Sequence, residues 1–186
     1  MLAVALADGR LPFVDAHTLK VVRTLSPDTA APPTTWESFS PDGQTLATSG
    51  WSGVVRLWDV ESGRPLLHFL AAAGAGLSVG FDPTGELLVT SGTDGSTRLW
   101  DAATGKQFGI DFPGFNNVWN DAAFTPDGSS LVIVYSNGRA FVWPATWQAW
   151  AAHACEVAGR QLTREEWSAF IQERSYEPVC PAAPLP

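Results

Sequence analysis

The sequence predicts an all-β protein assembled from repeated units of four short strands. The first observation behind this is a Phe-x-Pro-x-Gly segment that starts three times, at Phe39, Phe81 and Phe124. The second is a tryptophan that closes each copy, at Trp58, Trp100 and Trp143. Both features therefore repeat with steps of 42 residues (39 to 81, 58 to 100) and 43 residues (81 to 124, 100 to 143). The third is the abundance of turn residues, 17 Gly and 14 Pro, which many short strands require.

Alternation and turn residues divide each unit into strands. In the unit 76–110 we expect four strands, at 77–81, 87–90, 97–100 and 106–110. The first turn contains Pro83, which fixes φ, and Gly85, which adopts positive φ. Asp94-Gly95 is typical of a tight hairpin turn between the next two strands. The unit 36–70 repeats this plan.

The two ends of the repeated region are expected to hold incomplete units. Aligning Asp15 with Asp59 places Leu2 on Leu46, so residues 1–25 correspond to the last three strands of a unit. The last unit, 118–144, shows the first three strands. The sequence thus predicts about 14 strands in four units, at 1–25, 36–70, 76–110 and 118–144.

The period changes after Trp143, and residues 145–186 are expected to form a helical tail packed on the last units. Apolar residues from Trp147 to Ala158 follow the spacing of one helix face. The Thr163-Arg164-Glu165-Glu166 segment is a capping box at the start of a second short helix.

The two middle units carry Phe-x-Pro-x-Gly, Ser-Gly and Arg-Leu-Trp-Asp in register, and over about 2–150 the chain resembles the WD-repeat family of β-propellers. The resemblance implies propeller blades, which in this family form rings of about seven, so four units predict an open arc. It also assigns blade-building roles to Trp58, Asp59, Asp94, Trp100, Asp101 and Trp143. The chain departs from the family because it lacks the Gly-His pair and has Ser52 and Asn137 at two positions of the turn aspartate.

A second resemblance covers the tail. The segment from Ala154 to Trp167 and then Tyr176 to Pro181 resembles the closing segment of large bacterial WD-repeat signalling ATPases or related regulators. It implies that the chain is the C-terminal sensor part of such a protein. No phosphate-binding Gly-x-x-x-x-Gly-Lys-Ser/Thr segment is present, so the ATPase is not expected in this sequence. Cys155 and Cys180 form a disulfide if the tail folds back, and reduced thiols are the alternative.

Charge and motifs argue against several function classes. A net charge of −8 without clustered Lys and Arg predicts no nucleic-acid partner. No apolar run has the roughly 18–20 residues that span a bilayer, so we expect a cytoplasmic protein without a membrane partner. The segment Gly76-Leu77-Ser78-Val79-Gly80 fits Gly-x-Ser-x-Gly, but it falls in an expected strand and not in a strand-to-helix turn. The three histidines are scattered, so we expect no catalytic residue, cofactor or metal ion.

Aromatic residues in loops and at strand starts are the candidates for partner binding: Trp51, Trp36, Phe115 and Trp119. These loops are expected at one face of the propeller, where exposed aromatic residues act as interface anchors. The sequence therefore predicts a non-enzymatic platform for a protein partner, either another domain of the parent chain or a signalling protein. One alternative is a self-contained scaffold that completes its ring by oligomerisation, and another is a serine hydrolase using Ser78.

Overall fold

A computed structural model describes residues 1–6, 8, 10–25, 34–72, 77–112, 114–115, 118–146 and 163–166. These residues form fourteen strands in four antiparallel sheets, each of which corresponds to one predicted unit. Sheet 1 contains β1 (Leu2–Ala3), β2 (Leu11–Val14) and β3 (Val21–Leu25). Sheet 2 contains β4 (Thr34–Phe39), β5 (Thr45–Gly50), β6 (Val54–Asp59) and β7 (Pro65–Leu70).

The remaining two sheets follow the same plan. Sheet 3 contains β8 (Leu77–Phe81), β9 (Leu87–Gly92), β10 (Thr97–Asp101) and β11 (Gln107–Phe112). Sheet 4 contains β12 (Asn120–Phe124), β13 (Ser130–Tyr135) and β14 (Ala140–Pro144). The prediction of three, four, four and three strands is confirmed, because consecutive strands in every sheet are hydrogen-bonded neighbours.

The chemistry of the first turn explains how the first two strands of sheets 2, 3 and 4 are connected. In the turn between β8 and β9, the Asp82 carboxylate accepts hydrogen bonds from the backbone N–H of Leu87 (2.9 Å) and the hydroxyl of Thr84 (2.5 Å). Gly85 closes this turn with a φ of 80°, a left-handed conformation that glycine adopts without a steric penalty. The sheets thus start from local signals that need no tertiary contact.

The core consists of three clusters, one at each junction between successive sheets. Side chains that alternate along one strand belong to different clusters. Leu46 of β5 faces sheet 1, whereas its neighbour Ala47 faces sheet 3, because side chains along a strand point to opposite faces. The junction of sheets 1 and 2 buries Leu11, Phe13, Leu25, Leu46 and Trp58. The junction of sheets 2 and 3 buries Ala47, Val55, Leu57, Ala71, Ala72, Val79, Leu88 and Trp100. The junction of sheets 3 and 4 buries Val89, Leu99, Leu131, Ile133, Tyr135 and Ala145.

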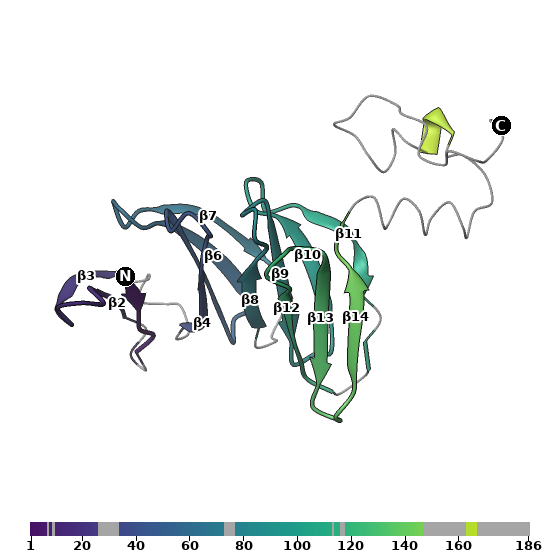
Figure 1. Ribbon diagram of the computed structural model, residues 1–186, viewed down its shortest axis with the longest axis horizontal. Helices are drawn as coiled ribbons and strands as arrows, with labels where there is room; N and C mark the ends of the chain where they lie inside the picture. Colours follow the sequence, from purple (N-terminus) through teal and green to yellow (C-terminus); the bar gives the residue numbers. More distant parts are fainter. Residues whose placement is uncertain are drawn as a thin grey trace.

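The sheets follow one another in an open row, from purple sheet 1 at one end to green sheet 4 at the other (Figure 1). Each inner strand lies beside the inner strand of the next sheet, β4 beside β8 and β8 beside β12. The faces at the two ends of the row carry exposed apolar side chains, which include Leu2 and Val4 on sheet 1 and Val134 and Val142 on sheet 4.

Six residues of the tail are described, Ala145, Thr146 and 163–166, and the last four show the capping box. The backbone N–H of Glu166 donates to the Thr163 hydroxyl (3.1 Å), and the backbone N–H of Thr163 donates to the Glu166 carboxylate (2.8 Å). The predicted helix face from Trp147 to Ala158, the Cys155–Cys180 pair and the packing of the tail on the last sheets lie outside the described residues. In the described part of the chain, no helix has the length and apolar character needed to cross a bilayer.

Candidate interaction surface

Trp51 projects from the tight turn between β5 and β6. Its side chain is 56% exposed, and its ring lies 6.2 Å from that of Trp36 on β4, at an angle of 56°. The turn below it is closed by the Gly53 N–H, which donates to the Gly50 carbonyl (3.1 Å). Two of the four predicted partner-binding aromatic residues therefore lie together, and the partly buried Trp36 supports the exposed Trp51.

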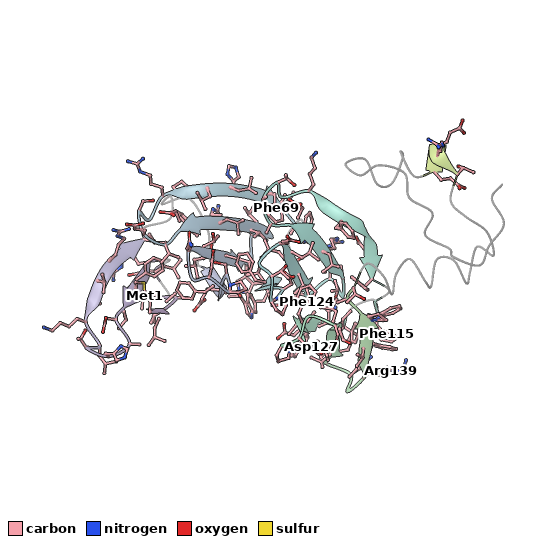
Figure 2. The ribbon with its side chains drawn as sticks, turned by 45° about the horizontal axis from the view of Figure 1, so that its top comes forward. Met1, Phe69, Phe115, Phe124, Asp127 and Arg139 are labelled. Atoms are coloured by element: carbon pink, nitrogen blue, oxygen red, sulfur yellow. The ribbon has the colours of Figure 1, made fainter. Side chains whose placement is uncertain are left out.

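Phe115 lies in an aromatic group at the sheet 4 end of the row. Its ring packs edge-to-face on Tyr135 (5.0 Å) and lies 6.1 Å from Phe141. The Arg139 guanidinium lies 5.0 Å from the Phe115 ring centroid, which is a cation–π arrangement, and Figure 2 shows the two residues side by side. Phe115 is thus partly buried in this aromatic group.

The segment that carries Phe115 approaches the turn between β9 and β10 without space for a side chain. A Cβ added to Gly95 would overlap the Phe115 carbonyl oxygen, and one added to Gly114 would overlap the Gly95 carbonyl oxygen. Gly95 also has a φ of 77°. The loop before β12 is therefore held on this turn by backbone-to-backbone contact that only glycine permits.

Trp119 follows in the same loop, and its side chain is 59% exposed. Its backbone is fixed, because the Trp119 carbonyl accepts a hydrogen bond from the Ser136 N–H (3.0 Å) in the turn between β13 and β14. Trp51 and Trp119 are therefore two exposed indoles on fixed backbone, one on sheet 2 and one beside sheet 4.

The blade-building tryptophans have a buried hydrogen-bond partner that sequence reasoning missed. The indole N–H of Trp58 donates to the Thr48 hydroxyl (2.9 Å), and that of Trp100 donates to the Thr90 hydroxyl (2.9 Å). Both hydroxyls are buried. The signal was present in the sequence, because Thr48 and Thr90 occupy equivalent positions one period of 42 residues apart.

Sheet 4 replaces this pair. The position of Thr48 and Thr90 holds Ile133, which is fully buried, and Trp143 instead packs edge-to-face on Phe112 (5.8 Å).

No sequence pattern had pointed to Asn120, a buried residue at the start of β12. Its amide accepts from the Gly92 N–H (3.0 Å) and donates to the Thr97 hydroxyl (2.7 Å), so it ties β12 to the neighbouring sheet.

The aspartates that follow the tryptophans cap turns. Asp101 accepts from the backbone N–H and the hydroxyl of Thr104, both at 2.7 Å, and Asp59 accepts in the same way from Ser62. The hydrogen bonds from Ser62 lower the pKa of Asp59 below its usual value. Asp94 accepts from Ser96 (2.5 Å from its hydroxyl) and lies 3.5 Å from Arg98. These carboxylates are engaged in local structure, as turn aspartates are.

Ser78 lies on β8 and has structural partners. Its hydroxyl lies 2.7 Å from the Ser91 hydroxyl and donates to the Asp121 carboxylate (2.7 Å). The strand continues through Gly80 to Phe81, so the residue is not on the sharp strand-to-helix turn that exposes a hydrolase nucleophile. His17 and His68 belong to a turn of sheet 1 and to the outer strand of sheet 2, and His153 lies outside the described residues.

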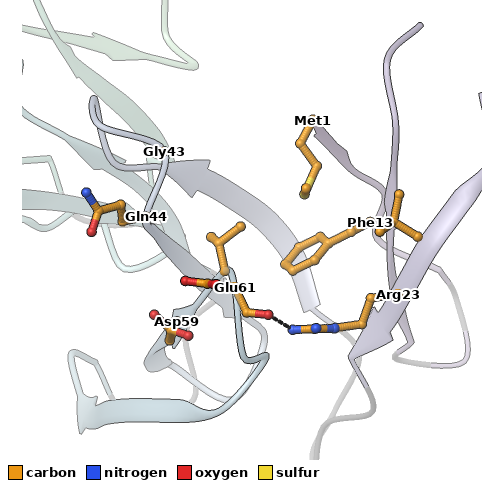
Figure 3. Close-up of a pocket in the computed structure, with 9 residues that line it drawn as sticks. Met1, Phe13, Arg23, Gly43, Gln44, Asp59 and Glu61 are labelled. Atoms are coloured by element: carbon orange, nitrogen blue, oxygen red, sulfur yellow. Dashed lines mark hydrogen bonds between the residues drawn. The ribbon is translucent and has the colours of Figure 1, made fainter. Parts of the chain in front are cut away.

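A cavity of about 370 Å³ opens at the junction of sheets 1 and 2 (Figure 3). Its wall consists of Met1, Phe13, Val22, Arg23, Gly43, Gln44, Asp59, Val60 and Glu61. Two of the polar side chains in this wall are paired, since Arg23 donates to the Glu61 carbonyl and Asp59 accepts from Ser62. Much of the remaining wall is apolar, formed by Met1, Phe13, Val22 and Val60.

Comparison with known proteins agrees with the repeated sheets. A family model described as WD domain, G-beta repeat matches residues 12–59 and 66–101. Both matches end at a Trp-Asp pair, Trp58-Asp59 and Trp100-Asp101. No curated protein matches the chain. WD repeats are in general non-enzymatic modules of protein–protein interaction. Residues 12–59 and 66–101 therefore carry WD repeats, and the four sheets of the described chain follow one another as blades of the β-propeller type in an open row.

Proposed function

We propose that the chain is a non-enzymatic protein-interaction platform and that its partner docks on Trp51. The exposure of this indole on a tight turn, with Trp36 beneath it, is the observation that carries the proposal. A tryptophan offers a large contact area with few rotatable bonds, and a ring already supported by a neighbour loses little freedom on binding. Trp119 offers a second contact of the same kind.

The proposal can be tested with Trp51→Ala and a matched control, Leu66→Ala. Leu66 is similarly exposed, at 58%, but lies on the outer strand β7. We expect Trp51→Ala to weaken the binding of a captured partner by about 1–2 kcal/mol, roughly tenfold or more, while Leu66→Ala has little effect. Partners are identified by affinity capture and then titrated by calorimetry. Loss of folding in Trp51→Ala without a specific loss of binding would show that Trp51 is core.

We infer further that the platform is the sensor end of a bacterial WD-repeat signalling protein in the cytoplasm. The resemblance of the segment from Ala154 to Pro181 to the closing segment of such proteins supports this inference. The partner is then another domain of the parent chain or a signalling protein. Sequencing the reading frame before Met1 tests it, and a nucleotide-binding switch followed by further blades is the expected result. A complete short gene would overturn it.

The exposed apolar faces at the two ends of the row favour a second candidate, a scaffold that completes its ring with another copy. Repeat arrays bury such faces against neighbouring units. Light scattering separates the candidates, because a stable dimer at nanomolar concentration favours the scaffold and a monomer favours the sensor.

A further inference from the structure

Sheets 2 and 3 carry an arginine at the same position of the repeat, Arg56 on β6 and Arg98 on β10. The Arg98 side chain is only 17% exposed and binds the Asp111 carboxylate side-on. Its Nε donates to one carboxylate oxygen (3.0 Å), and its Nη2 lies 2.7 Å from the other. Its Nη1 donates to the Ser96 hydroxyl (2.6 Å) and lies 3.5 Å from the Asp94 carboxylate. The charge of Arg98 is thus balanced by two aspartates of its own sheet.

Sheet 2 lacks the first of these aspartates. Asp94 belongs to the turn between the second and third strands of sheet 3, and Ser52 is the residue at that position of sheet 2, 42 residues earlier. The Ser52 hydroxyl accepts a hydrogen bond from the backbone N–H of Val54 (3.3 Å). A neutral hydroxyl, engaged with its own turn, therefore stands where sheet 3 has a carboxylate.

The outer strand lacks the second aspartate. In sheet 3, Asp111 comes directly before the residue that pairs with Thr97 of β10. In sheet 2, His68 comes directly before the residue that pairs with Val55, the counterpart of Thr97 on β6. His68 is therefore the counterpart of Asp111, and it lies directly opposite Arg56 in the register of the two strands. An imidazole thus takes the place of the acid that neutralises the arginine in sheet 3.

The Arg56 guanidinium is accessible and has no acidic partner in the described part of the chain. It forms no ion pair or hydrogen bond there, whereas its counterpart Arg98 forms several. No buried side-chain nitrogen or oxygen of the described residues lacks a partner, so the guanidinium nitrogens of Arg56 reach solvent. His68 beside it is exposed.

The register also shows which face of sheet 2 carries this pair. Phe69, labelled in Figure 2, packs on Trp100 of sheet 3 with ring centroids 4.8 Å apart. Neighbouring side chains of a strand point to opposite faces, so His68 and Arg56 lie on the face turned away from sheet 3. Leu70, two residues further along β7, lies on the same face and is 60% exposed.

This surroundings favours a carboxylate as the missing partner. An arginine side chain stays charged at any physiological pH, and its planar fork matches the two oxygens of a carboxylate. The chain as a whole carries a net charge of −8, so a lone cation next to an exposed leucine is a local exception on an acidic protein. The pair Arg98–Asp111 shows that the same position of the repeat accommodates a carboxylate bound side-on.

We propose that Arg56 and His68 form a docking site for an acidic side chain of a protein partner. The Arg56 guanidinium binds the partner's aspartate or glutamate side-on, and the imidazole of His68 donates a further hydrogen bond. Leu70 contacts an apolar residue next to the acidic one. An ion pair that sheet 3 makes internally is thus completed in sheet 2 by another polypeptide. This site is separate from the proposed docking on Trp51 and extends the interaction surface to the outer half of sheet 2.

The probe is a fluorescein-labelled peptide, Val-Glu-Val-Glu-Val, and Val-Gln-Val-Gln-Val is its uncharged control. Each is titrated with the full chain at low ionic strength and followed by fluorescence anisotropy. We expect saturable binding of the glutamate peptide, at least about tenfold tighter than that of the control and weakened by added salt. Absence of binding, or equal binding of the two peptides, overturns the proposal. Displacement by inorganic phosphate, but not by acetate at the same concentration, would contradict a carboxylate site.

Arg56→Gln and Arg64→Gln form a matched pair on the protein side. Both remove one positive charge from sheet 2, but Arg64 lies in the turn before β7. We expect Arg56→Gln to weaken binding of the glutamate peptide at least about tenfold and Arg64→Gln to change it little. Thermal unfolding checks that both variants are folded. Equal effects of the two substitutions would contradict the assignment.

His68→Asp reproduces the arrangement of sheet 3, because it places a carboxylate opposite Arg56. We expect it to occupy the guanidinium and abolish binding of the glutamate peptide, whereas His68→Asn, which has a similar size and no charge, retains most of the binding. Retained binding in the folded His68→Asp variant would show that the peptide binds elsewhere and would overturn the proposal.

Asp28→Asn distinguishes a partner from the chain itself, since Asp28 belongs to the segment between sheets 1 and 2 that lies outside the described residues. We expect unchanged binding of the glutamate peptide. Binding at least about tenfold tighter in this variant would show that Asp28 occupies the site, and the assignment to a partner would be wrong. Trp51 is unchanged in all these variants, so failure of this proposal is distinguishable from failure of the docking on Trp51.

Discussion

The Trp58 indole N–H donates a hydrogen bond of 2.9 Å to the buried hydroxyl of Thr48, ten residues earlier on the neighbouring strand. The same hydroxyl donates to the Arg56 carbonyl (3.4 Å). Trp100 and Thr90 repeat the pair in the next blade. The tryptophan of this repeat is thus fixed by a polar contact as well as by packing. The buried indole N–H groups of Trp58 in sheet 2 and Trp100 in sheet 3 both have a hydrogen-bond acceptor.

Thr48→Val should destabilise the chain by about 1–3 kcal/mol, because it leaves the buried Trp58 N–H without an acceptor. Thr48→Ser is the matched control, since it keeps the hydroxyl and removes only a methyl group. Urea unfolding followed by tryptophan fluorescence measures both. Equal losses for the two variants would mean that packing, and not the hydrogen bond, holds Trp58.

Gly95→Ala should destabilise the fold more than Gly138→Ala. At Gly138 the added methyl group meets no atom, so the penalty is the left-handed backbone conformation alone, about 1–2 kcal/mol. At Gly95 the methyl group also overlaps the Phe115 carbonyl oxygen and must displace the loop. Thermal unfolding compares the two variants. Similar melting temperatures would show that the loop before β12 moves away without cost.

Acid should destabilise the chain through its turn aspartates. Hydrogen bonds from Thr125 and Ser129 lower the pKa of Asp127 to about 2, below the value near 4 of an unfolded aspartate. A lowered folded-state pKa contributes stability above the unfolded value, and this stability is lost as the pH falls from about 4 to about 2. Asp42 and Asp59 act in the same direction, since hydrogen bonds lower the pKa of each.

Asp127→Asn provides the check, because it keeps an acceptor oxygen and removes the titration. Thermal unfolding between about pH 5 and pH 2 should show a shallower pH dependence in this variant than in the wild-type chain. Glu37 opposes the aspartates, since burial raises its pKa and its contribution is lost as the pH rises. An unchanged slope in Asp127→Asn would assign the acid sensitivity to other groups.

Ser78→Ala addresses the hydrolase alternative directly. The substitution removes the hydrogen bonds to Ser91 and Asp121 and should reduce stability by about 1 kcal/mol. Hydrolysis of p-nitrophenyl acetate should be the same for both proteins at a temperature where both are folded. A loss of hydrolysis in the folded variant would overturn the non-enzymatic assignment.

The sequence by itself determined the blades and the face of the sheet on which each side chain lies. Phe-x-Pro-x-Gly and Asp-Gly turns act locally, and the strict alternation of a strand sends Leu46 to one junction and Ala47 to the next. Four sheets and fourteen strands could therefore be predicted from repeats of 42 and 43 residues.

The tertiary structure decided what the surfaces offer. Trp51 and Trp58 are the same residue type seven positions apart, yet one is exposed on a turn and the other is buried against sheet 1. Asn120 forms hydrogen bonds with residues 28 and 23 positions earlier. Pro41 and Pro83 lie over Gly85 and Gly128 of the next sheet, whereas no described atom lies within 4 Å of the Cβ position of Gly43. Such features depend on which neighbouring sheet supplies an atom at a given point, and local periodicity carries no information about that neighbour.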